Sequence, residues 1–230
     1  MARSGRGSTV HRPEAGGASG TRAALIGAAI GALREDGYAG ASARAIARRA
    51  GCTQALVFYH FGSVVNLLLA ALDQVATARM AHYRAAVDRA GGPAELVEVA
   101  RAIFEEDLDA GHIAVLAEMI AGTSSTPGLA AEVATRLEPW RAFAAGAVAG
   151  ALAGSPLASM APPDEVGHGV VALYLGLEML AHLDGDRTAA LRLFDRAGEL
   201  ARLLEALAPR PDGPAGAPPA ADRPSRRTPA

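Results

Sequence analysis

Hydrophobic residues recur with a helical period along most of the chain, and strand-like alternation is nearly absent. Apolar positions 25, 26, 29, 30 and 33 predict a first helix from Thr21 to about residue 36. Positions 43, 46, 47 and 50 predict a second helix, which Ser42 caps and Gly51 ends. Thr53 then begins a very short third helix to about residue 60, and Ser63 begins a long fourth helix to about residue 90.

The rest of the chain repeats the same helical pattern in longer segments. Further helices are expected at about 93–109, 112–122, 128–153 (interrupted by Pro139), 163–184 and 186–208. The pattern therefore predicts an all-α protein: three short helices with a helix-turn-helix, followed by a bundle of about six helices. The expected divisions are a flexible basic arm (1–20), the three short helices (21–66), the helical bundle (67–208) and a disordered Pro/Ala-rich tail (209–230).

Charge divides the chain in a similar way. Residues 1–66 contain 8 Arg and 3 acidic residues, whereas residues 67–209 contain 10 Arg and 19 acidic residues. The N-terminal part therefore carries a net charge of +5 and the following part −9. This asymmetry indicates that the N-terminal end meets a polyanion.

The second and third predicted helices have the spacing of a helix-turn-helix. Ala47 is small where the helices cross, Gly51 provides the positive φ of the turn, and Val57 fills the space between the helices. The second helix of such a unit enters the DNA major groove with its N-terminal end first. Base contacts are expected from Thr53, Gln54 and Ala55, and phosphate contacts from Ser42, Arg44, Tyr59 and His60.

The stretch from Thr21 to Leu69 resembles the DNA-binding domain of the tetracycline-repressor (TetR) family. The resemblance is carried by Gly37-Tyr38, Ser42, Ile46-Ala47, Ala50-Gly51 and Tyr59-His60-Phe61. It implies a homodimeric transcription regulator, usually a repressor, with a DNA-binding domain (21–66) and a variable C-terminal domain (67–208) that binds a small ligand and dimerises. We also expect Arg22 to contact DNA.

Two residues depart from the pattern of the family. Phe58 stands where the family usually has a tyrosine, and Val64 where it usually has a lysine. Both family residues commonly touch phosphates, so their loss predicts a smaller salt dependence of DNA binding. Compensation is expected from Arg48, Arg49, or an arm carrying Arg3, Arg6 and Arg12.

The bundle contains candidate residues for a ligand pocket, with ordinary core packing as the alternative for each. Trp140 is the strongest single candidate, because it follows Pro139 and a proline opens a helix. His112, Glu118 and His182 are possible polar anchors, and the effector is expected to be hydrophobic. The predicted ligand-binding residues are Phe104, Leu108, Met119, Trp140, Phe143 and Tyr174.

The last two predicted helices carry long apolar faces. Two such helices from each subunit can form a four-helix interface, and a two-fold dimer reads an inverted-repeat operator in double-stranded DNA. The predicted dimerisation residues are Val166, Val170, Leu173, Leu177, Leu191, Phe194 and Leu200.

Other classes of function have little support in the sequence. The chain lacks nucleotide-binding glycine loops, a GxSxG nucleophile motif and metal-binding histidine spacings, so we expect no enzyme activity, cofactor or metal. The sequence predicts neither a signal peptide nor a membrane span, and its single cysteine cannot form an intrachain disulfide. These features predict a cytoplasmic protein. Three alternatives remain open: a regulator of this fold without a ligand or acting as an activator, a structural helical dimer with a weakened DNA-binding head, and a helical enzyme.

Overall fold

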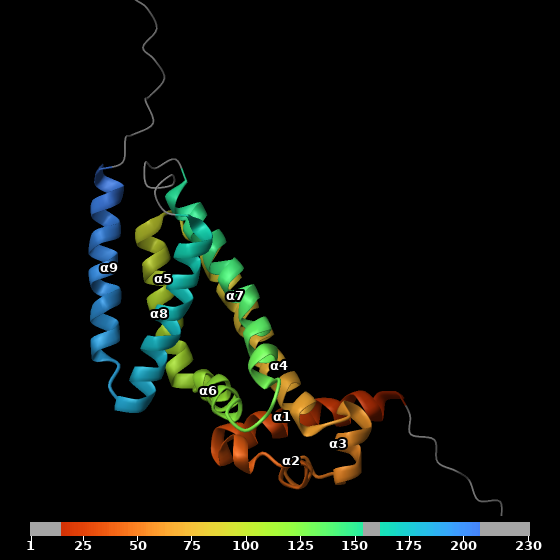
Figure 1. Cartoon of the computed structure of the whole chain (residues 1–230). Coiled ribbons are helices and arrows are strands. Elements are labelled where there is room, and N and C mark those ends of the chain that lie inside the picture. The colour runs from red at the N-terminus through yellow and green to blue at the C-terminus, as the bar shows by residue number, and fades with distance from the viewer. Residues whose placement is uncertain (1–14, 154–161, 208–230) are drawn as a thin grey trace, which may run out of the picture.

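The computed structural model describes residues 15–153 and 162–207, and these residues form helices and no strand (Figure 1). The predicted all-α fold is therefore confirmed. Most of the predicted arm, the link around 154–161 and the tail lie outside the described residues. The helices are α1 (Ala15–Gly40), α2 (Ala43–Arg49), α3 (Gln54–Phe61), α4 (Val64–Val87), α5 (Pro93–Ala110), α6 (His112–Gly122), α7 (Leu129–Leu152), α8 (Pro163–Asp184) and α9 (Thr188–Leu207).

Helices α1, α2 and α3 form a closely packed unit at the lower end of the molecule in Figure 1. Leu25, Leu33, Ile46 and Val57 have no exposed surface. Small residues such as Ala29 let the helices approach closely enough to close this core. The same hydrophobic cluster continues into α4 and α6, so the bundle holds the unit by a shared core.

The start of α1 differs from the prediction. The helix begins at Ala15, so Thr21 lies inside it and residues 15–20 are helical instead of part of the arm. The predicted end near residue 36 agrees better: Gly37 adopts φ 71° and ψ 178°, which breaks the regular helix before it resumes to Gly40. A residue without a Cβ adopts this backbone conformation readily.

Two of the predicted helix caps are present. The Ser42 hydroxyl accepts a hydrogen bond from the Ala45 amide at 3.2 Å, and the Ser63 hydroxyl accepts one from the Asn66 amide at 3.1 Å. These bonds satisfy amide groups at the starts of α2 and α4. Thr53 also lies at the N-cap position of α3, but its side chain makes no capping hydrogen bond.

The remaining helices form an elongated bundle in which α7 packs along α8 and α5 packs along α9 (Figure 1). Gly167 lies so close to α7 that a Cβ there would come within 2.6 Å of the Ala145 backbone nitrogen. The predicted interruption at Pro139 is wrong, because α7 continues through this residue as one helix.

Helices α4 and α8 are each long and apolar enough to cross a membrane. The expectation of no membrane span depended on the charged residues within such segments, and these two helices contain Asp73 and Glu178 respectively. Both helices pack against other helices of the bundle, and core helices pass the same test, so we interpret them as bundle helices.

Candidate functional site

The α2–α3 pair has the geometry of a helix-turn-helix. Gly51 adopts φ 67° in the turn, and the Cys52 amide donates a hydrogen bond to the Ala47 carbonyl at 3.0 Å. Ala47 and Val57 are buried where the two helices meet. The roles predicted for these residues from their spacing agree with the structure.

The residues predicted to contact DNA lie largely on the surface of this unit. Tyr59 has 80% of its side chain exposed, and the ring of His60 meets it edge-on at 4.9 Å. Arg22 is exposed and lies over the Phe61 ring at 5.0 Å. Ser42, Arg44, Thr53, Gln54 and Ala55 are also exposed, whereas His60 is half-buried.

The two residues that depart from the family pattern have different surroundings. Phe58 is 46% exposed, so it offers an apolar surface beside Tyr59 on α3. Val64 is partly buried against the core of the α1–α3 unit.

Arg48 and Arg49 differ in their availability to phosphates. Arg49 pairs with Glu35 at 2.8 Å and with Asp36 at 3.2 Å, so its charge is already balanced. Arg48 is exposed and forms no ion pair within the described part of the chain. Of these two candidates for compensation, Arg48 is therefore the available one.

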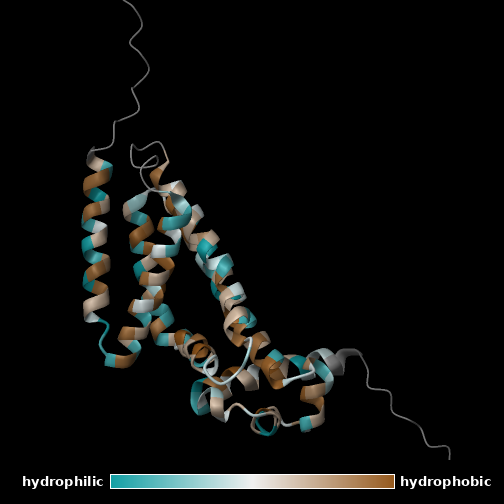
Figure 2. Ribbon diagram, in the orientation of Figure 1, coloured by the Kyte–Doolittle hydropathy of each residue, from teal (hydrophilic) through white to brown (hydrophobic). Residues whose placement is uncertain are grey.

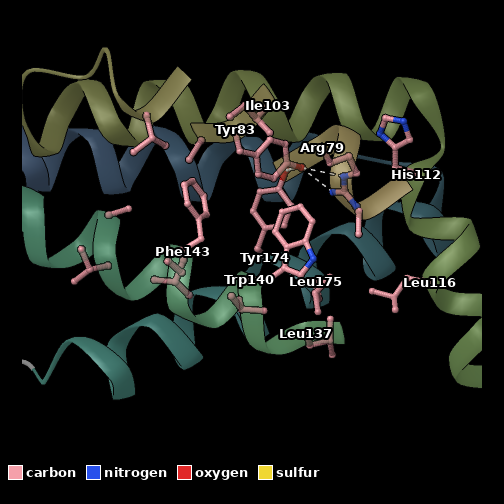
Figure 3. A pocket seen from close by; sticks show the side chains of 18 of the residues that line it. Arg79, Tyr83, Ile103, His112, Leu116, Leu137, Trp140, Phe143, Tyr174 and Leu175 are labelled. Carbon is pink, nitrogen blue, oxygen red and sulfur yellow. Dashed lines mark hydrogen bonds between the residues drawn. The ribbon is translucent and has the colours of Figure 1, made fainter. Parts of the chain in front are cut away.

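A largely apolar cavity of about 370 Å³ lies inside the bundle (Figure 3). Its wall includes residues of α4 from Leu72 to Val87, which span about 22 Å along the helix. Helices α5, α6, α7, α8 and α9 supply the rest of the wall. Trp140, Phe143 and Tyr174 border the cavity, and their rings lie near that of Tyr83.

A buried cluster of charged and hydroxyl groups lies at this wall. Arg79 pairs with Asp107 and with Glu178, the latter at 3.3 Å. Its guanidinium also donates to the Tyr83 hydroxyl at 2.7 Å, as the dashed lines in Figure 3 show. The Tyr174 hydroxyl donates to Asp107 at 2.9 Å.

Burial changes the acidity of two members of this cluster. It raises the pKa of Glu178 to about 7, although the neighbouring Arg79 guanidinium lowers it. One oxygen of this carboxylate, Oε2, is buried and accepts no hydrogen bond from the described residues, which further disfavours the ionised form. Burial and the charge of Asp107 also raise the pKa of Tyr174, so this hydroxyl keeps its proton.

Comparison with known proteins agrees with the helix-turn-helix geometry. Residues 25–71 match the family model described as bacterial regulatory proteins, tetR family. The match contains the turn glycine and the whole of α3. The N-terminal domain is a TetR-family DNA-binding domain.

Solved structures extend the similarity from the N-terminal domain to the bundle. The regulatory protein TetR from Rhodobacter sphaeroides is 20% identical, with a TM-score of 0.64 over 78% of this chain and 97% of that one. FadR from Bacillus subtilis, in complex with stearoyl-CoA, is 13% identical, with a TM-score of 0.66 over 78% and 96%. The fatty acid degradation regulator FadR from Bacillus halodurans is 13% identical, with a TM-score of 0.66 over 79% and 94%. At these identities the similarity shows the fold, and no curated protein matches the sequence.

The structure separates the predicted ligand-binding residues into two groups. Trp140, Phe143 and Tyr174 line the cavity, as does the suggested polar anchor His112. Phe104, Leu108 and Met119 do not line it. Met119 is fully buried in the core shared with the α1–α3 unit, while Phe104 and Leu108 belong to a cluster beneath α9.

The other two suggested polar anchors lie away from the cavity wall. Glu118 instead accepts a hydrogen bond from the Tyr38 amide at 2.7 Å. The Tyr38 hydroxyl bonds to Thr126 at 2.9 Å, and its ring lies against Gly122. Glu118 therefore fixes α6 to the end of α1. His182 is an exposed residue in the last turn of α8.

Sequence reasoning missed Arg79, Asp107 and Glu178 as members of the cavity cluster. A signal for Glu178 exists, because it is the only Asp, Glu or Arg between residues 166 and 183. A lone charge in an apolar helix indicates a buried, paired group. Arg79 carries a similar signal, since it follows Leu72 and Val75 on the apolar face of α4.

The predicted dimerisation residues also separate into two groups. Val170, Leu173 and Leu200 are exposed, at 43%, 60% and 62% respectively. Three others, Leu177, Leu191 and Phe194, pack within the protomer around Phe104 and Ala181. Val166 is half-buried. Further large apolar side chains are exposed on the same two helices: Leu180 and Leu183 on α8, and Leu193, Leu203 and Leu204 on α9. Figure 2 shows hydrophobic positions recurring along both helices.

Among the described residues, no group of three or more His, Cys, Asp or Glu side chains has an arrangement that could hold a metal ion. The family and the solved structures compared above are regulators, and no enzyme family emerges from the comparison.

Proposed function

We propose that this TetR-family protein is a cytoplasmic homodimeric repressor that a small ligand releases from an inverted-repeat operator in double-stranded DNA. The observation that carries the proposal is the continuity of α4. This helix begins at Val64, three residues after the end of α3, and its middle lines the cavity at Leu72, Val75 and Arg79. One helix therefore adjoins both the DNA-reading element and the cavity.

The exposed side chains of α3 support the DNA-binding part of the proposal. Gln54 and Ala55 lie at its N-terminal end, where a recognition helix meets base edges. A glutamine forms two hydrogen bonds with adenine, and an alanine methyl contacts the thymine methyl. Tyr59 and Arg44, with exposed polar side chains, are suited to phosphates.

The exposed apolar side chains of α8 and α9 support dimerisation. A stable protein–protein interface has a hydrophobic core, and large exposed apolar patches mark such sites. Leu173 and Leu180 of α8, with Leu200 and Leu203 of α9, are suited to a two-fold contact with a second copy.

A ligand in the cavity would act by a shift between two arrangements of the dimer. It would displace α4, and the Glu118–Tyr38 contact of α6 offers a second connection to the α1–α3 unit. A ligand that favours the arrangement unsuited to DNA by about 3 kcal/mol would lower operator affinity more than 100-fold. The stearoyl-CoA complex of the similar FadR structure supports a ligand-responsive role for this bundle.

The test is a gel shift on the DNA that flanks the gene of this protein, at two salt concentrations, with sedimentation of the free protein. We expect a dimer and a specific shift that weakens with salt. Gln54→Ala and Tyr59→Ala should each weaken binding about 10-fold, within the range of a lost base or phosphate contact. Arg89→Ala, between α4 and α5, is the control variant, because this residue is exposed and lies outside the α1–α3 unit and outside helices α8 and α9.

A folded dimer that gives no shift at low salt would contradict the proposal. That outcome would favour a structural helical dimer with a weakened DNA-binding head, as the presence of Phe58 and Val64 suggests.

A further inference from the structure

The charges around the cavity restrict the chemistry of the molecule that fits it. Arg79 is neutralised by Asp107, and its guanidinium also lies 3.3 Å from the Glu178 carboxyl group. Arg136, the other arginine on the wall, pairs with Asp73 and with Glu132, both at 2.8 Å. Both cations therefore have acidic partners in the protein itself.

A charged ligand gains little from this arrangement. A carboxylate beside Arg79 would also lie near Asp107 and Glu178, and it would have to lose its water without gaining an unpaired cation. An ammonium group would face the two arginines, because no acidic residue lines the cavity. His112, the remaining titratable nitrogen on the wall, already lies 3.0 Å from Asp107.

The wall still offers hydrogen-bond donors. The indole N–H of Trp140 donates to no acceptor within the described residues, and no described group accepts a hydrogen bond from Nη1 of Arg79. Neither nitrogen is among the fully enclosed polar atoms without a partner, so both have accessible surface. The hydroxyl proton of Tyr174 is committed to Asp107.

Apolar side chains continue on both sides of these donors along α4. Leu72 and Val75 lie toward the α1–α3 unit, and Val87 lies toward the opposite end, near Leu96 of α5. Figure 3 shows Trp140 and Arg79 close to each other, with Phe143 farther along the wall. The cavity is thus an elongated apolar space with hydrogen-bond donors partway along it.

We infer that the effector is an uncharged, elongated and largely apolar molecule with a hydrogen-bond-accepting oxygen, such as a ketone or an ester, that accepts from Trp140. This inference rests on the proposed ligand-responsive function and defines the class of its ligand. It distinguishes ketones and esters from fatty-acid anions and alkyl amines of the same length.

The test uses the protein as its own reporter, because Trp140 is the single tryptophan of the chain. Three probes of similar length are titrated at pH 7, below their aggregation concentrations: 2-undecanone, decanoate and decylammonium. Tryptophan fluorescence and calorimetry both measure the affinity. We expect 2-undecanone to bind at least about 10-fold more tightly than either ion, since burying an unpaired charge is costly.

Two variants locate the interaction by calorimetry. Trp140→Phe keeps a ring but removes the N–H, and should weaken 2-undecanone about 3- to 10-fold, as expected for one hydrogen bond. Phe143→Leu changes only an apolar part of the cavity wall, so it should weaken the binding of all three probes to a similar degree. An unchanged affinity of Trp140→Phe for 2-undecanone would overturn the role of the indole donor.

Equal or tighter binding of decanoate or decylammonium would overturn the inferred ligand class, while leaving a ligand-responsive regulator in place. If none of the three probes binds, the inference is overturned. The cavity then no longer supports a small-molecule effector. The operator gel shift is independent of all three probes. It therefore separates a failure of this inference from a failure of the proposed DNA-binding function.

Discussion

In the α1–α3 unit, Leu25, Leu33, Ile46 and Val57 have no exposed surface and are closed in by small alanines. In the bundle, side chains of similar size border a cavity of about 370 Å³, and a cluster of charges lies beside them. The first region has one tightly filled interior, whereas the second leaves room between its helices. Filled cores hold one arrangement firmly, and unfilled ones accept a ligand or a shift of helices. This difference fits the proposed roles: a DNA-binding unit that keeps one shape, and a bundle that changes its arrangement when a ligand binds.

The largest effect is expected from a comparison of two substitutions, one in each region, by their cost to the free energy of unfolding. Leu33→Ala should lower the free energy of unfolding by about 3–4 kcal/mol, because it leaves a new cavity in a filled core. Leu137→Ala, on the wall of the existing cavity, should cost only about 1 kcal/mol. Urea unfolding at one protein concentration measures both. Equal losses would mean that the bundle interior is as tightly packed as the N-terminal unit.

The contact between the two regions provides the second test. A Cβ on Gly122 would lie 2.5 Å from atoms of the Tyr38 ring, so Gly122→Ala should cost about 2 kcal/mol through overpacking. DNA binding should weaken as well, since α1 shifts relative to α6. Gly146→Ala is the matched control: a Cβ there meets nothing within 4 Å. It should raise stability by about 0.5–1 kcal/mol.

The third test concerns the buried charge of the bundle. Burial raises the pKa of Glu178 from 4.5 to about 7. Its contribution to stability is therefore fully present below about pH 4.5 and is lost as the pH rises through about 7. Glu178→Gln removes this loss of stability at high pH, because a glutamine side chain does not ionise. At pH 8 the variant should be more stable than the wild type by about 3 kcal/mol, and near pH 4.5 the two should be similar. Parallel pH–stability curves would contradict the assignment.

The smallest expected effect compares two neighbouring arginines of α2. Arg48→Ala should reduce the salt dependence of DNA binding by about one counterion and weaken affinity a few-fold. Arg49→Ala should leave the salt slope nearly unchanged, because its charge is paired with Glu35 and Asp36. Gel shifts across a salt series measure the two slopes. A larger change for Arg49→Ala would show that its acidic partners release it on binding.

The helices and the turn of the N-terminal unit were predictable because local signals determine them. Ser42, Gly51 and Ser63 mark helix ends through their own hydrogen bonds and backbone angles. The start of α1 was not predictable. Thr21 has the residue type of a helix cap, but the helix begins earlier, at Ala15. The interruption predicted at Pro139 was wrong for a similar reason: α7 accommodates the proline within one continuous helix.

The cavity was less predictable, because its cluster combines α4, α5 and α8. Arg79 and Glu178 are 99 positions apart in the sequence, and no local pattern relates them. Aromatic residues were equally ambiguous: Phe104 and Phe143 look alike in the sequence, but only Phe143 borders the cavity. Which apolar side chains face a gap depends on how the helices cross.

Helix α4 has a mechanical consequence. Its 24 residues form one unbroken rod of about 36 Å. A tilt of about 5° about one end would displace the other by about 3 Å, which is close to the 3.4 Å rise between successive base pairs of DNA. A rigid lever of this length can convert a movement of less than the width of an atom beside the cavity into a misregister of about one base pair at the operator.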